Sequence, residues 1–246
     1  MITTQDRQVL LHLLRGQARE GSHAERLENF YAPQAGYYDH FRERLLHGRR
    51  ELIAALQPAP GQWVVELGGG TGRNLDFFGA RLGTLARFDL VDLCPSLLAQ
   101  ARLRAAQWPG IVRVHEADAT RFRPDTEGRQ VADCVYFSYS LSMIPDWRRA
   151  LCNALRMLKP GGLLGVVDFY VSSKEPPPGR QRHSWLQRQC WPRWFRHDGV
   201  SLDGGQFDEV TRLTENVRCE EHLAALPYLP GLRVPYYLYI GRKKNH

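Results

Sequence analysis

A short apolar strand that runs into a glycine-rich turn constrains the fold of this chain more than any other feature. Residues 64–74 read Val-Val-Glu-Leu-Gly-Gly-Gly-Thr-Gly-Arg-Asn, with glycines at positions 68, 70 and 72 after Glu66. A backbone without Cβ atoms can turn tightly and lie close against a ligand. The dinucleotide-binding fingerprint needs glycine at its sixth position, where this chain has Arg73. The pattern therefore predicts a ligand-binding strand and turn of another kind.

From about residue 60 the chain alternates between short apolar strands and helices. This alternation predicts an α/β fold, with a Rossmann-like, mostly parallel sheet covered by helices on both faces. Residues 1–55 are expected to form a helical and aromatic cap segment, and residues 56–246 the main domain, with an insertion at 172–232. Strands are expected at 62–67, 87–92, 111–115, 131–138, 162–171 and 233–240, and helices near 73–82, 95–107 and 146–158.

Acidic or polar residues occur where several of these strands end, namely Glu66, Asp92, Asp118 and Ser138. Ligands of such sheets bind at the carboxyl ends of the strands. Asp92 follows Gly72 by 20 residues, where a carboxylate can accept both ribose hydroxyls. Asp118 is placed to receive an adenine amino group. A single aspartate would more often be a turn or cap residue, but the set favours a nucleoside ligand.

Glycine at every second position, with Glu66 two residues upstream, resembles the loop of class I S-adenosyl-L-methionine (SAM)-dependent methyltransferases. The resemblance implies the fold of that class, with a mostly parallel seven-stranded sheet, and SAM as the cofactor. SAM carries no phosphate, so the loop needs close backbone approach rather than a phosphate cradle. No metal site is expected. The residues expected to bind the cofactor are Tyr38, Glu66, Gly68, Gly69, Gly70, Thr71, Asn74, Asp92, Leu93, Asp118, Ala119 and Ser138.

Further blocks narrow the resemblance. Residues 138–145, 165–171 and 234–241 contain Ser-Leu-Ser-Met-Ile-Pro, Val-Val-Asp-Phe-Tyr-Val and Pro-Tyr-Tyr. Together with residues 90–97 they resemble the N-methyltransferase of bacterial betaine-lipid synthesis, from about residue 30 to the C-terminus. That family methylates diacylglyceryl homoserine to diacylglyceryl-N,N,N-trimethylhomoserine. The resemblance also implies a functional pairing with the 3-amino-3-carboxypropyl transferase that forms the homoserine lipid.

Other acceptors and classes remain open at this point. The acceptor could be phosphatidylethanolamine or a soluble amine, and a SAM-binding protein without turnover is a different class. A nucleic-acid methyltransferase is suggested by charge alone. Enzymes that methylate base amines usually carry an Asn-Pro-Pro-aromatic loop where this chain has Ser-Tyr-Ser-Leu-Ser-Met-Ile-Pro. We therefore expect no nucleic-acid partner, and the oligomeric state is left open.

The expected chemistry gives roles to aromatic and titratable side chains. Quaternary ammonium and sulfonium cations are both stabilised over aromatic faces, which favours a functional role for Tyr38 and Tyr139. The acceptor amine must lose a proton before it attacks. Asp168, at a predicted strand end, and His183 are the candidates for accepting that proton. Each also has an ordinary interpretation, as a turn residue and as a surface histidine respectively.

The net charge of +7 arises mostly from arginine, because only four of the 33 basic residues are lysine. Such an excess suggests an anionic partner, although it can also be spread over solvated faces. Residues 180–196 hold five arginines, three of the six tryptophans and no acidic residue. That composition suits contact with an anionic membrane, and a lid helix is the alternative. Pro192 is expected to limit any continuous helix.

The remaining features concern location. No apolar run approaches the roughly 20 residues of a membrane span, and the first residues do not read as a signal peptide. Five scattered cysteines, odd in number and without CxxC pairing, favour a reduced, cytoplasmic protein without structural zinc. A lipid substrate would bring the protein to the inner face of the membrane.

Overall fold

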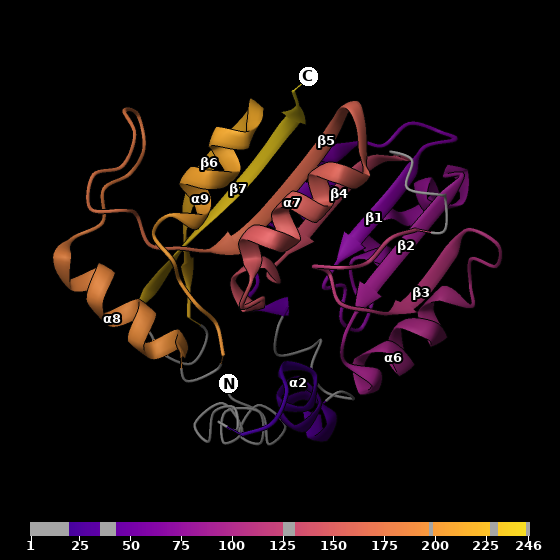
Figure 1. The fold of residues 1–246 in the computed structure, drawn as a ribbon, viewed down its shortest axis with the longest axis horizontal. Helices are drawn as coiled ribbons and strands as arrows, with labels where there is room; N and C mark the ends of the chain where they lie inside the picture. The colour runs from indigo at the N-terminus through magenta and orange to yellow at the C-terminus, as the bar shows by residue number, and fades with distance from the viewer. Residues whose placement is uncertain (1–19, 35–42, 125–130, 197–198, 227–230, 245–246) are drawn as a thin grey trace.

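The computed structural model describes residues 20–34, 43–124, 131–196, 199–226 and 231–244. Its centre is a seven-stranded sheet of order β3-β2-β1-β4-β5-β7-β6 (Figure 1). The predicted Rossmann-like, mostly parallel sheet is confirmed. Its first five strands are parallel, β7 pairs antiparallel with β5, and β6 pairs antiparallel with β7. The strands are β1 (Trp63–Leu67), β2 (Arg87–Asp92), β3 (Val112–Glu116), β4 (Ala132–Ser138), β5 (Leu158–Phe169), β6 (Thr214–Ala225) and β7 (Arg233–Lys243).

Helices cover both faces of the sheet because the central strands are apolar on both sides. One buried cluster joins the sheet to α4, α5 and α6, and another joins it to α7 and α9. The helices are α2 (His23–Tyr31), α4 (Arg49–Leu56), α5 (Leu75–Phe78), α6 (Pro95–Ala105), α7 (Trp147–Met157), α8 (Trp185–Arg196) and α9 (Gln206–Leu213), with 3₁₀ segments at Ala32–Gln34, Gly79–Thr84 and Leu141–Met143.

Three details differ from the sequence-based expectations. Strand β6 lies inside the expected insertion 172–232, and most of its side chains are exposed or half-buried. An edge strand of this kind carries no clear apolar alternation, so its sequence gave no strand signal. The helix expected near 73–82 is divided, because Gly79 has φ +54° and ends the α-helical part. Helix α8 continues through Pro192, although proline removes a backbone N–H donor and crowds the carbonyl four residues earlier; its fixed φ is compatible with a helix.

Helix α2 is held in place across the carboxyl ends of the parallel strands, where the candidate site lies. Ser22 and Glu25 form a capping box at its start. The Glu28 carboxylate accepts hydrogen bonds from the backbone N–H of Ser96 (3.1 Å), from the Ser96 hydroxyl and from Cys94 Sγ (3.1 Å). Helix α6 has no side-chain cap of its own, so Glu28 supplies an anion at its N-terminus.

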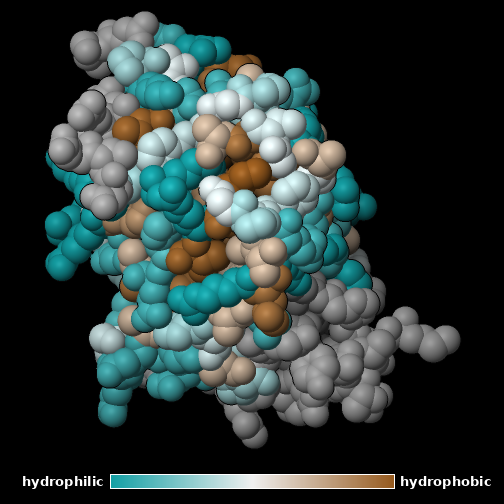
Figure 2. Space-filling model, turned by 90° about the vertical axis from the view of Figure 1, so that its right-hand side faces the viewer, coloured by the Kyte–Doolittle hydropathy of each residue, from teal (hydrophilic) through white to brown (hydrophobic). Residues whose placement is uncertain are grey.

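None of the helices in the described ranges is long and apolar enough to cross a membrane. The side of the molecule that carries β3 and α6 is mostly hydrophilic, with hydrophobic residues in small separate patches (Figure 2).

Candidate active site

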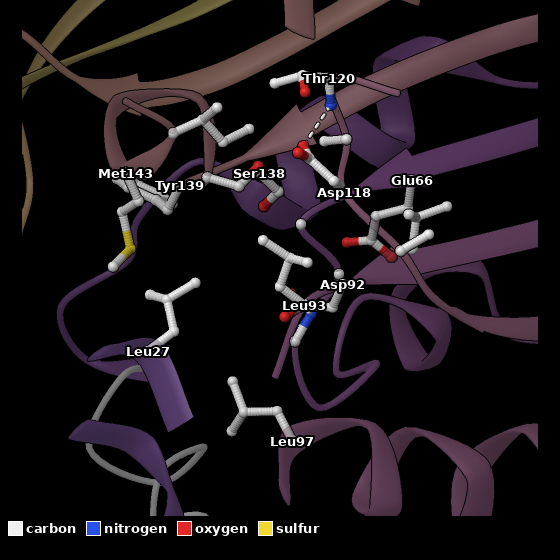
Figure 3. Close-up of a pocket in the computed structure, with 18 of the residues that line it drawn as sticks. Leu27, Glu66, Asp92, Leu93, Leu97, Asp118, Thr120, Ser138, Tyr139 and Met143 are labelled. Atoms are coloured by element: carbon white, nitrogen blue, oxygen red, sulfur yellow. Dashed lines mark hydrogen bonds between the residues drawn. The ribbon is translucent and has the colours of Figure 1, made fainter. Parts of the chain in front are cut away.

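A cavity of about 340 Å³ opens at the carboxyl ends of β1, β2 and β4, where the strand order reverses (Figure 3). Its volume is in the range of small-ligand sites. Of the residues expected to bind the cofactor, all but one line this cavity; Tyr38 lies outside the described residues. Tyr139 also lines it. The cofactor set brought together is Glu66, Gly68, Gly69, Gly70, Thr71, Asn74, Asp92, Leu93, Asp118, Ala119 and Ser138.

The turn after β1 owes its shape to glycines with different surroundings. Gly68 and Gly70 have φ of +77° and +54°, in the left-handed region that side chains disfavour. A Cβ atom on Gly68 would collide with the Ser140 side chain. A Cβ on Gly70 would meet only Leu97 Cδ1, at 3.7 Å. Gly68 is therefore required by the packing of two loops, whereas Gly70 borders open space in the cavity.

Asp92 is held by the backbone on two sides. Its Oδ2 accepts a hydrogen bond from the Gly70 N–H (2.8 Å), and its Oδ1 accepts one from the Cys94 N–H (2.9 Å). Burial raises the pKa of this carboxyl, and the backbone hydrogen bonds oppose the shift. An ionised carboxylate accepts about four hydrogen bonds. Asp92 thus keeps acceptor capacity for a ligand's hydroxyl groups while its orientation is set.

Glu66 and Asn74 form a buried polar pair at the floor of the cavity. Asn74 Nδ2 donates to Glu66 Oε1 at 2.6 Å, and burial raises the pKa of Glu66 to about 7, although the Asn74 hydrogen bond lowers it. The nearby Tyr136 hydroxyl also lowers the pKa of Glu66, but neither this hydroxyl nor Glu66 Oε2 meets hydrogen-bond geometry with any group in the described part of the chain. Asn74 Oδ1 and Ser138 Oγ are also without a hydrogen bond there. Buried polar atoms left in this way are expected to meet a polar ligand.

The loop after β3 forms another polar wall. Asp118 Oδ1 accepts a hydrogen bond from the Thr120 N–H at 2.8 Å (Figure 3). From α7, Asn153 Nδ2 donates to the carbonyls of Ala119 (2.8 Å) and Phe122 (2.9 Å) and holds the loop in place. A carboxylate on a fixed loop is suited to accept a hydrogen bond from an adenine amino group. Together with Asp92 and Glu66, this wall fits the parts of SAM.

The opposite wall of the cavity is apolar and aromatic (Figure 3). Leu27 and Tyr31 come from α2 and Met143 from the loop after β4, and the Tyr31 hydroxyl donates to Met143 Sδ at 3.3 Å. Sequence reasoning did not assign these residues to the site. The spacing of Leu27 and Tyr31 by four predicts one helix face, but nothing in it tells which surface that face covers.

Tyr139 lies where β4 meets the cavity, and its backbone has φ +54°. Its hydroxyl donates to the His47 carbonyl at 2.6 Å, and its ring packs against Phe169 with a centroid distance of 4.6 Å. Left-handed backbone at a residue other than glycine costs energy and tends to occur at functional sites. Tyr139 thus lines the candidate site, and its functional role stays a prediction.

Asp168 and His183, the expected proton acceptors, do not line the cavity, and their proposed roles stay predictions. The Asp168 carboxylate accepts hydrogen bonds from the Ser142 N–H (2.9 Å), the Ser142 hydroxyl (2.7 Å) and the Phe169 N–H (2.8 Å). Through Ser142, the Asp168 carboxylate fixes the loop that carries Met143. His183 Nδ1 accepts from the Ser172 N–H (3.0 Å), so its ring fastens the chain ahead of α8.

Comparison with known proteins identifies the class that this fold and site define. The family model described as a methyltransferase domain matches residues 64–162. A demethylmenaquinone methyltransferase of Thermus thermophilus is 31% identical over 193 residues, which cover 77% of this chain and 82% of the relative. The chain belongs to the class I SAM-dependent methyltransferases. It is a methyltransferase enzyme with SAM as its cofactor.

Two further matches agree with this family. A ubiquinone/menaquinone biosynthesis C-methyltransferase of Vibrio cholerae is 29% identical over 179 residues, covering 70% of this chain and 67% of the relative. The structure of a Haemonchus contortus phosphoethanolamine N-methyltransferase with SAM has a TM-score of 0.66 at 15% identity. That match covers 92% of this chain and 61% of the other. At this identity the structural match shows the shared fold.

Proposed function

We propose that this methyltransferase transfers methyl groups successively to the amine of diacylglyceryl homoserine, forming the trimethylated betaine lipid. The carrying observation is that the sequence blocks resembling the betaine-lipid enzyme are neighbours in the fold. Residues 138–145 form the loop with Tyr139 and Met143. Asp168 in the block 165–171 anchors that loop through Ser142. Residues 234–241 lie in β7, which pairs with β5 at Phe169↔Tyr236.

The apolar wall suits an amine that becomes a quaternary ammonium. SAM supplies the methyl group from a positively charged sulfur. Tyr31 and Tyr139 both line the cavity, and an aromatic face stabilises a cation by about 0.5–2 kcal/mol, depending on its desolvation. Methyl transfer is a displacement along a line, so the protein contributes chiefly alignment and exclusion of water. After the last transfer the nitrogen carries no proton. This wall suits such a nitrogen, because aromatic contacts with a cation need no N–H donor.

Proton loss from the acceptor is assigned to no side chain. Asp168 and His183, the residues considered for it, do not line the cavity. We expect the amine to bind as its free base after losing the proton to solvent. The ratio kcat/KM should then rise with pH towards the pKa of the free amine. A plateau well below that pKa would instead indicate a base in the site.

The direct experiment uses labelled SAM and diacylglyceryl homoserine in mixed micelles, with the lipids analysed by mass spectrometry. Mono-, di- and trimethylated products are expected, and they should be lost in Asp92→Ala. The control is Leu103→Ala on α6, because this side chain is 68% exposed and lies outside the cavity. Binding of SAM without methylated homoserine lipid would overturn this acceptor and leave the enzyme class unchanged.

A second candidate acceptor is a carbon atom of demethylmenaquinone. It is favoured by the 31% identity to the Thermus thermophilus enzyme. The same assay with demethylmenaquinone, with phosphatidylethanolamine and with soluble amines separates the candidates. Methylation of the quinone and of none of the amines would favour this second candidate.

A further inference from the structure

Helix α8 presents large apolar side chains to solvent. Trp185, Leu186 and Trp194 are 69%, 61% and 45% exposed. Leu186, Cys190 and Trp194 are spaced by four residues and form one row along the helix, and all three are exposed. Among the described residues, seven large hydrophobic side chains are exposed, and α8 carries three of them. A cluster of exposed apolar side chains on one short helix indicates an interaction surface.

The inward face of α8 is the part that packs. Phe195 is buried, and its ring lies 4.9 Å from that of Phe169 and 6.1 Å from that of Trp191. Since the contact between Phe195 and Phe169 of β5 attaches the helix to the sheet, the exposed tryptophans are not needed for that attachment. No residue of α8 lines the cavity. A lid would turn its apolar side towards the cavity, and α8 does not.

The chain ahead of α8 is fastened to the edge of the sheet. Glu221 of β6 accepts hydrogen bonds from the Tyr170 hydroxyl (2.7 Å), from Arg180 Nε (3.1 Å) and from the Gln181 N–H (2.9 Å). Both charged partners are largely buried, with side-chain exposures of 12% for Arg180 and 8% for Glu221. The segment that leads into α8 is therefore fixed to the edge of the sheet.

The charge of this region indicates the chemistry of its partner. Arg182, Arg193 and Arg196 are exposed, and residues 180–196 contain no acidic side chain. Within the described ranges, no carboxylate forms an ion pair with any of these three arginines. Arginine forks bind phosphate groups, and tryptophan is favoured at the boundary between headgroups and acyl chains.

The position of α8 fits a role at a surface. The parallel strands point towards the end of the molecule where α2 and α8 lie (Figure 1). The cavity is at that same end. A flat surface touched by α8 would therefore lie on the side of the cavity and not behind it.

We propose that α8 binds the surface of an anionic membrane, with Trp185, Leu186 and Trp194 among the lipid headgroups and Arg182, Arg193 and Arg196 on lipid phosphates. Apolar burial and attraction of arginine to anionic lipids act together in this mode of binding. The binding is independent of the identity of the methyl acceptor.

The test is sedimentation of the whole 246-residue chain with vesicles of phosphatidylcholine alone or mixed with phosphatidylglycerol. Binding to the mixed vesicles is expected, weakening as salt rises. The double variant Trp185→Ser/Trp194→Ser and the double variant Arg193→Gln/Arg196→Gln should each lose about tenfold or more in vesicle affinity. Tryptophan fluorescence of the unchanged protein should be quenched by brominated lipid.

Matched controls come from the opposite side of the molecule. Leu103→Ser removes an exposed apolar side chain, and Arg102→Gln/Arg113→Gln removes two exposed charges; both should bind vesicles normally. Every variant is checked by SAM binding and thermal unfolding, so loss through misfolding is recognised.

Several outcomes would overturn the proposal: equal loss in the α8 and control variants, no preference for phosphatidylglycerol, or α8 variants that change the oligomeric state and not vesicle binding. The last would make this face a protein interface. Vesicle binding without methylation of homoserine lipid would support the membrane contact and overturn only the proposed methyl acceptor.

Discussion

The carboxyl ends of β1 and β5 each carry a completely buried carboxylate, and their surroundings differ. Asp168, in β5, accepts three hydrogen bonds, from the Ser142 N–H and hydroxyl and from the Phe169 N–H. Glu66, in β1, accepts one from Asn74, and its Oε2 accepts none within the described chain. Both side chains have 0% exposure. A buried carboxylate whose neighbours supply enough hydrogen-bond donors stabilises the fold. A buried carboxylate with too few donors, beside a cavity, can accept hydrogen bonds from a ligand.

The pKa values are shifted in the same direction at both residues, so the hydrogen-bond partners and not the pKa values separate them. Burial raises the pKa of Glu66 to about 7 and that of Asp168 to about 6, and hydrogen bonds oppose the shift at both residues. Glu66 therefore titrates near neutral pH, where binding of a cationic ligand group would favour its charged form.

The largest expected effect tests the turn that follows Glu66. Gly68→Ala should lower the free energy of unfolding by about 4 kcal/mol, because left-handed backbone and a collision with Ser140 add together. Gly70→Ala has only the backbone cost and should lose about 1–2 kcal/mol. Urea unfolding measures both. Equal losses would show that Gly68 and Gly70 do not differ in their surroundings.

The β5 end is tested by Asp168→Asn. An amide nitrogen would replace an oxygen that faces donors, so the free energy of unfolding should fall by about 3 kcal/mol. Turnover should fall only to the extent that the lost hydrogen bonds allow the loop after β4 to move. A variant of normal stability that has lost turnover, with SAM binding unchanged, would return Asp168 to a direct chemical role.

The pH dependence of stability tests Glu66. Its folded pKa of about 7 lies above the ordinary value of 4.5. The folded state therefore holds a proton that the unfolded state releases between these values. The resulting stability is complete below about pH 4.5 and is lost as pH rises through 7. Glu66→Gln should make the fall in stability between pH 5 and 8 smaller by about 2 kcal/mol.

Thermal and urea unfolding across that pH range measure the effect without SAM. Glu116→Gln, at an exposed position of β3, is the control and should leave the profile unchanged. An unaltered profile in Glu66→Gln would mean that Glu66 is ionised in the folded protein at all these values.

The smallest expected effect concerns Asp92. Asp92→Asn keeps one acceptor oxygen and loses the charge, so SAM affinity should fall about tenfold. Calorimetric titration with SAM measures the loss, with Glu116→Gln again as the control. An unchanged affinity would indicate that the ligand does not contact this carboxylate.

The gathering of the polar residues at one cavity could be predicted from the sequence for a physical reason. Glu66, Gly68, Asp92 and Asp118 each lie within a few residues of a strand end, and parallel strands bring their carboxyl ends to one edge. Short-range patterns therefore determine which of these residues meet. The apolar runs of β1 and β4 likewise predict central strands, because both their faces are buried.

What the sequence determined by itself was thus the parallel sheet, the methyltransferase class and the polar half of the cavity. The tertiary structure alone decided which buried carboxylate received donors, that α2 supplied Leu27 and Tyr31 to the cavity, and that β6 was an edge strand. It also decided that the tryptophans of α8 faced outward. These outcomes depend on contacts between segments far apart in the chain. A local sequence pattern does not specify which distant segment its side chains will contact.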